Sequence, residues 1–135
     1  MTLGEAISRL DELKPNGFSR GQKIFWLSAL DATVKKEIID SHEGGGDMGF
    51  APYDEGSADD TALLVPAPYD EVYLRYLEAQ IDYSNGEYDR FNNSNAMYAA
   101  AYTAFSRAYN RSHMPIGGRK KYYLKGAKET AVPKT

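Results

Sequence analysis

The side chains best suited to chemistry in this 135-residue chain are two histidines and a cluster of carboxylates. His42 and His113 lie far apart, and neither belongs to an HxxxH or histidine-carboxylate pattern typical of metal sites. No Gly-x-Ser-x-Gly motif marks a nucleophilic serine. The chain has no cysteine, which excludes disulfides and thiolate ligands. We therefore expect no catalytic residues, no metal and no cofactor, and a protein that is not an enzyme.

The carboxylates are concentrated in the segment 42–67, which also contains the glycine run 44–46. The glycines lack the lysine and Ser/Thr of a phosphate loop, and the acids lack the spacing of a calcium loop. We expect an exposed acidic loop and no packed element, with 63–65 either a short strand or a segment that fastens the loop to the body. A hydrolase that uses Asp59 or Asp60 is the enzymatic alternative, although nothing selects a catalytic pair. The loop acids are Glu43, Asp47, Asp54, Glu55, Asp59 and Asp60.

Charge is distributed unevenly along the chain. Residues 1–114 hold ten Lys/Arg against eighteen Asp/Glu, whereas 115–135 hold six against one. The acidic loop repels polyanions, while the basic segment is suited to phosphates or to an acidic protein partner, and the sequence does not separate these two. The helical pattern stops at Pro115, so we interpret 115–135 as an extended C-terminal arm. Its candidate binding residues are Arg119, Lys120, Lys121, Tyr122, Tyr123, Leu124 and Lys125.

Apolar spacing predicts helices along the rest of the chain. Thr2 with Glu5 matches a capping box before a helix that ends at Leu13, and Ser19 with Gln22 repeats the signal before a helix that ends near residue 39. A third helix follows Pro68, and a fourth runs to about residue 114, with the turn between them at either 84–86 or 92–95. The predicted fold is all-α, a bundle of about four helices in a domain 1–114. No membrane-spanning run and no signal peptide is present, so we expect an intracellular protein.

Tyrosines and alanines alternate in the last predicted helix. Alanines let another helix approach closely, and the rings fill the space beside it, which favours a core or a subunit interface. A stacking platform for single-stranded nucleic acid is disfavoured, because basic residues are not interleaved with the rings. The candidate packing or interface residues are Trp26, Tyr69, Tyr73, Tyr98, Tyr102 and Phe105.

Several sequence blocks carry a family resemblance. They read LVPAPYDE (64–71), YLEAQIDYSNGE (76–87), NNS (92–94) and YNRSHMP (109–115), with LKPN (13–16) and WLSALD (26–31) before them. Over residues 1 to about 115, the chain resembles phage and prophage proteins from Gram-positive hosts that act as head-to-tail connectors. These adaptor, or head completion, proteins belong to long-tailed double-stranded DNA phages.

The resemblance implies a structural virion protein in the neck, at the head-tail interface, assembled in the host cytoplasm. Such subunits form a homo-oligomeric ring, commonly a dodecamer, that binds the portal protein and a tail-side neck or tail completion protein. Double-stranded DNA passes through the channel without specific binding, and no membrane is involved. By position and charge, the arm residues 119–125 would grip the portal and the loop acids would face the channel or the tail. The alternative is a small phage-encoded nucleic-acid-binding regulator that uses the basic arm.

Overall fold

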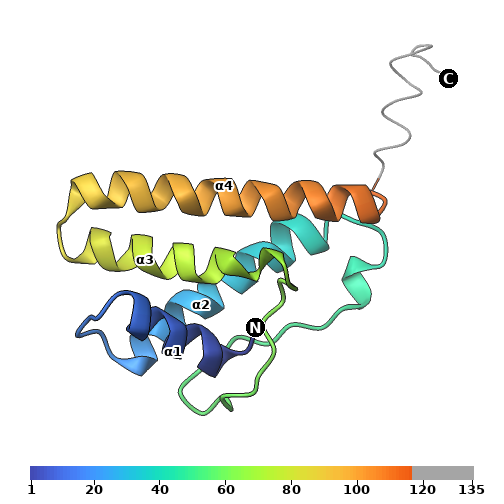
Figure 1. Cartoon of the computed structure of the whole chain (residues 1–135). Helices are drawn as coiled ribbons and strands as arrows, with labels where there is room; N and C mark the ends of the chain where they lie inside the picture. The colour runs from blue at the N-terminus through green and yellow to red at the C-terminus, as the bar shows by residue number, and fades with distance from the viewer. Residues whose placement is uncertain (117–135) are drawn as a thin grey trace, which may run out of the picture.

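The computed structural model describes residues 1–116 of the chain. In this part, four α-helices and three short helical turns form a bundle (Figure 1). The elements are α1 (Leu3–Leu13), α2 (Arg20–Val34), η1 (Lys35–Ile39), η2 (Gly45–Asp47), η3 (Tyr69–Glu71), α3 (Val72–Ser84) and α4 (Tyr88–Ser112). The predicted all-α bundle is thus confirmed, whereas the predicted arm residues 119–125 lie outside the described residues. None of the helices in residues 1–116 is long and apolar enough to cross a membrane.

The first two helices begin where the sequence predicts. Thr2 Oγ1 accepts a hydrogen bond from the Glu5 amide at 3.2 Å, and Glu5 Oε1 accepts one from the Thr2 amide at 2.8 Å, which completes the capping box. Ser19 Oγ accepts from the Gln22 amide at 3.1 Å. Each cap satisfies an amide that has no partner inside its helix.

The second helix extends as far as predicted but changes its winding. Helical backbone angles continue through Val34 into η1, a π-helical turn in which the amide of Asp40 donates to the Lys35 carbonyl at 2.8 Å. Ile38 and Ile39 at its end are both buried.

Helix α3 lies in the middle of the bundle, with α4 on one side and α1 and α2 on the other (Figure 1). The buried apolar residues of α3 lie on several sides of the helix: Val72, Tyr73, Leu74, Leu77, Ala79 and Ile81. A helix with neighbours on several sides can bury residues around most of its circumference.

The turn between α3 and α4 is at Asn85 and Gly86, where Gly86 has a φ of 73°. The other candidate turn, 92–95, is wrong, because α4 runs through it without interruption. Ser94 Oγ donates to Asp82 Oδ2 at 2.9 Å, so a residue of low helix propensity here bonds α4 to α3.

The tyrosine stripe of α4 faces the chain's own core. Ring centroids of Tyr76 on α3 and Tyr98 on α4 are 5.0 Å apart, and those of Tyr69 and Phe105 are 6.2 Å apart. Among the six candidate packing residues, Trp26, Tyr73 and Phe105 are buried, while Tyr69, Tyr98 and Tyr102 are partly buried against the core. The contacts of Tyr98, Tyr102 and Phe105 therefore join α4 to the rest of the bundle within one subunit.

The segment 42–67 is a long loop with exposed acidic side chains, as predicted, and parts of its backbone are fastened to the body. The amides of Leu3 and Gly4, which have no acceptor inside α1, donate to the carbonyls of Thr61 and Asp59, each at 2.9 Å. Leu63 and Val65 are buried. No strand is present between residues 1 and 116, so 63–65 has the fastening role that the sequence left as one of two possibilities.

Candidate functional site

The carboxylate of Asp31 on α2 is the centre of a buried polar cluster that the sequence analysis did not single out. Its side chain is fully buried. The hydroxyl of Tyr53 donates to Oδ2 at 2.6 Å, and the Leu64 amide donates to the same oxygen at 3.0 Å. The hydroxyl of Tyr73 on α3 donates to Oδ1 at 2.6 Å. One carboxylate thus joins α2, α3 and two points of the loop.

The cluster extends one bond further, because the amide of Val65 donates to the Tyr73 hydroxyl at 2.7 Å. Tyr73 is 0% exposed. Burial raises the pKa of Asp31, although its three hydrogen bonds oppose that rise. Burial, followed by the nearby Asp31 carboxyl, raises the pKa of Tyr53 and of Tyr73. A carboxyl and a phenol enclosed in this way have no open route to a substrate, so the cluster serves to fasten the loop.

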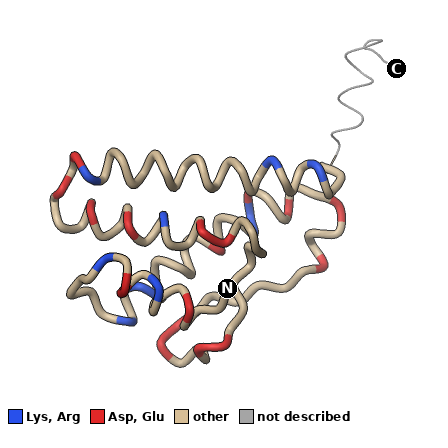
Figure 2. The backbone as a smooth tube through the Cα atoms, in the orientation of Figure 1, with Lys and Arg blue, Asp and Glu red and all other residues tan. Residues whose placement is uncertain are grey.

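The six loop acids are all exposed, but the structure places them in two separate regions (Figure 2). Asp54, Glu55, Asp59 and Asp60 occupy the stretch 54–60, where Asp59 forms an ion pair with Arg20 beside the start of α2. Glu43 and Asp47 lie beyond the end of η1, and the Glu43 amide donates to the Met114 carbonyl at 2.8 Å. The predicted acidic loop is therefore two acidic regions at different places on the body.

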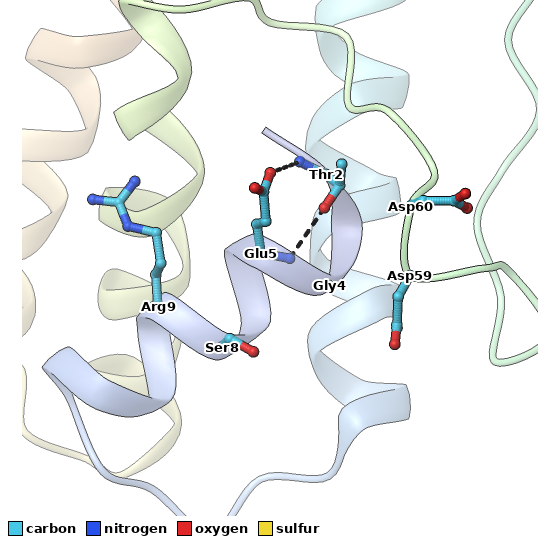
Figure 3. A pocket seen from close by; sticks show the side chains of 7 residues that line it. All are labelled: Thr2, Gly4, Glu5, Ser8, Arg9, Asp59 and Asp60. Carbon is cyan, nitrogen blue, oxygen red and sulfur yellow. Dashed lines mark hydrogen bonds between the residues drawn. The ribbon is translucent and has the colours of Figure 1, made fainter.

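An open hollow lies between the first turns of α1 and the loop (Figure 3). The Glu5 carboxylate in its wall is used by the capping box, and Asp59 and Asp60 point in different directions (Figure 3). Arg9 pairs with Glu71 at 3.1 Å. Paired acid-base catalysis requires two carboxylates that converge on one point. The carboxylates of this hollow do not converge in this way. The lining consists of Thr2, Gly4, Glu5, Ser8, Arg9, Asp59 and Asp60.

The structure brings the two histidines together at the end of α4. His42 is buried, its Nε2 lies 2.6 Å from Asn110 Oδ1, and its ring centroid is 6.3 Å from that of His113. Tyr109 stacks on His113 at 3.8 Å and meets His42 edge-on at 4.7 Å. No sequence pattern indicates this contact, because 71 positions separate the two histidines.

This histidine cluster fixes the direction in which the chain leaves α4. The segments 41–43 and 114–116 pair in an antiparallel bridge between His42 and Pro115. The Ile116 amide donates to the Ser41 carbonyl at 2.9 Å, in addition to the Glu43–Met114 bond. The point at which the basic segment begins is therefore held against the body by two backbone hydrogen bonds.

A mainly apolar groove of about 310 Å³ lies beside this exit, between α4 and the loop. Tyr69 and Phe105 form part of its wall, with Met48, which is 46% exposed, at its rim. Among residues 1–116, the lining of this groove includes no acid, no lysine and no arginine. It has the character of a packing surface.

In residues 1–116, no group of three or more His, Asp or Glu side chains is arranged to hold a metal ion. Comparison with known protein families, curated proteins and solved structures found no match for this chain. The case for a function therefore depends on the residues themselves and on the resemblance of the sequence blocks described above.

Proposed function

We propose that this chain is a non-enzymatic structural subunit, a head-to-tail adaptor of a phage neck. Copies of it form a ring, with twelve as the expected number, that binds the portal on one side and a tail-side protein on the other. Its partners are other proteins and its own copies, and DNA passes through the ring without being gripped. It acts in the virion, after assembly in the host cytoplasm.

The observation that carries this proposal is the anchored exit of the basic segment from an acidic body. The bridge between His42 and Pro115 fixes where residues 117–135 begin, and this segment holds six Lys/Arg against one Asp/Glu. A basic arm with a fixed starting point at one end of a rigid body suits attachment to an acidic surface on the portal. Many copies in a ring would bind such a surface strongly even if each arm bound weakly.

The exposed acids of 54–60 support the second part of the proposal. A channel for DNA needs a surface that does not hold phosphates, and four exposed carboxylates beside the start of α1 and α2 provide one by repulsion. We assign this stretch to the channel or to the tail side of the ring. A structure of the assembled neck with 54–60 on its outer surface, away from both, would contradict the assignment.

The test is portal binding by the full chain and by matched variants. Replacing Lys120 and Lys121 together with Ala should weaken attachment at least about tenfold, since two charges of the predicted contact are lost. The control replaces Lys128 and Lys134 with Ala, outside the predicted contact, and should change binding little. Equal binding by both variants would overturn the role of the arm. Tight DNA binding that weakens steeply with salt would favour the nucleic-acid-binding regulator instead.

A further inference from the structure

The outer face of α4 has a symmetric arrangement that the proposed function does not use. Ala100 lies at its centre, with Ala96 and Ala104 four residues away on either side, and Asn93 and Arg107 three residues beyond those. At 100° per residue, these five positions lie within about 40° of one line along the helix. All five are exposed.

The same line continues by four residues in each direction, to Asp89 and to Arg111. The spacing therefore reads 4-3-4-4-3-4 from either end. Asp89 and Arg111 are exposed, and within residues 1–116 neither of them, nor Arg107, takes part in an ion pair. The helix carries an acid at one end of this line and arginines at the other.

Between its charged ends, α4 has no charged residue from 91 to 106, a stretch of more than four turns (Figure 2). The tyrosines of this stretch face α3, so the exposed side consists of alanines with Met97, which is 50% exposed, Thr103 and three asparagines, Asn92, Asn93 and Asn95. Alanine side chains allow two helix axes to approach to about 8 Å. An uncharged helix face of this length on a body rich in acids is suited to another protein surface.

We propose that this face binds the same face of a second copy, with the two α4 helices antiparallel about a two-fold axis at Ala100. In that register, residues whose numbers sum to 200 face each other. Ala100 meets its equivalent, Ala96 meets Ala104 of the second copy, and Asn93 meets Arg107 of the second copy. Asp89 meets Arg111 of the second copy, so each pair of helices gains two ion pairs at its ends.

The charges select a second copy of this chain in the antiparallel direction. A parallel pair would place Asp89 against Asp89 and Arg111 against Arg111, and like charges in contact are unfavourable. The 4-3-4 spacing repeats every 11 residues, which keeps the line of residues from Asp89 to Arg111, here called the seam, on one side of a nearly straight helix. The helices, each roughly 37 Å long, therefore remain in contact along their length.

This pairing goes beyond the proposed ring. A two-fold pair is closed, because each copy uses the same surface, whereas a ring is built from contacts between different surfaces. We therefore expect the antiparallel pair to be the form of the protein before it joins the ring. When the neck assembles, the two α4 faces either separate from each other or contact a second ring. The pairing stands or falls independently of portal binding.

A charge-swap experiment on the full chain tests the pairing by analytical ultracentrifugation over a range of protein concentrations. Asp89→Arg and Arg111→Asp should each raise the dimer dissociation constant at least about tenfold, because each places like charges together at both ends of the pair. The double variant Asp89→Arg/Arg111→Asp should restore dimerisation to within about threefold of the original. Failure of the double variant to recover would overturn the antiparallel register.

Two substitutions at adjacent positions of α4 provide the matched comparison. Ala100→Glu puts two carboxylates against each other on the two-fold axis and should leave the protein monomeric. Ala99→Glu makes the same chemical change at an exposed position about 100° away from the seam and should leave the dimer intact. Circular dichroism of both variants checks that they fold. A folded Ala100→Glu variant that still dimerises, or a monomeric wild-type chain, would overturn the proposal.

Discussion

Tyr73 on α3 donates a hydrogen bond to Asp31 on α2 at 2.6 Å, and its hydroxyl also accepts one from the Val65 amide at 2.7 Å. A single buried hydroxyl therefore connects two helices and the return of the acidic loop. Through Asp31, the connection extends to Tyr53 and Leu64. The position of the loop on the body depends on this cluster.

Replacing Tyr73 with Phe should lower the free energy of unfolding by about 2–4 kcal/mol, because it leaves the buried Val65 amide without an acceptor and removes a donor from Asp31. Urea denaturation followed by circular dichroism measures the change. The control is Tyr83→Phe, since Tyr83 is 56% exposed and should contribute less than about 0.5 kcal/mol. Similar losses from both substitutions would contradict the role given to Tyr73.

The tyrosines also predict an alkaline limit to stability. Burial raises the pKa of Tyr98 to about 12, and burial also raises the pKa of Tyr73. Because an unfolded tyrosine releases its proton near pH 10, the free energy of unfolding should be steady below that pH and fall above it. Tyr73 contributes a slope of up to about 1.4 kcal/mol per pH unit.

Denaturation curves between pH 8 and pH 11 provide the measurement. Tyr73→Phe should show a shallower decline above pH 10 than the original chain. A free energy of unfolding that stays constant up to pH 11 would show that these hydroxyls are not held protonated by the fold.

Two adjacent glycines of η2, Gly45 and Gly46, predict opposite responses to the same substitution. A Cβ at Gly45 would lie 1.8 Å from the Ile39 carbonyl oxygen, whereas a Cβ at Gly46 meets nothing within 4 Å. Gly45→Ala should therefore destabilise the protein by roughly 1–3 kcal/mol or more, and Gly46→Ala should change it little. Thermal melting of the two variants tests this, and equal melting temperatures would be inconsistent with the close packing of 45 on η1.

The backbone pairing between 41–43 and 114–116, where the chain leaves α4, should depend on Asn110. Asn110→Ala removes the side chain 2.6 Å from His42 Nε2 and leaves a buried ring nitrogen without a partner, at a cost of roughly 1–3 kcal/mol. Hydrogen exchange of the Glu43 and Ile116 amides should become faster. Asn92→Ala, an exposed change on the same helix, is the control and should leave both amides protected. Unchanged exchange in Asn110→Ala would mean that His42 does not hold the exit.

Local rules predicted the helices well. The caps at Thr2 and Ser19 and the turn at Gly86 are short-range signals, and each is present in the structure. The choice between turns at 84–86 and 92–95 was open because propensity disfavours helix at 92–95, and the bond from Ser94 to Asp82 overrides that preference.

The Asp31 cluster could be predicted from the sequence only in part. Asp31 falls between Leu30 and Val34 on the apolar side of α2, and an acid at such a position indicates a buried partner. Nothing in the sequence identifies Tyr53 and Tyr73 as that partner, since 22 and 42 positions separate them from it. Long-range pairing of this kind depends on the path of the loop, which has no periodic signal.

The most direct test of the adaptor function is electron microscopy of the full chain, alone and mixed with the portal ring of the same phage or prophage. We expect a ring of this chain seated on the portal, with small particles when the portal is absent. Bare portal rings beside unassembled chain, together with DNA binding by the chain that weakens steeply with salt, would contradict it.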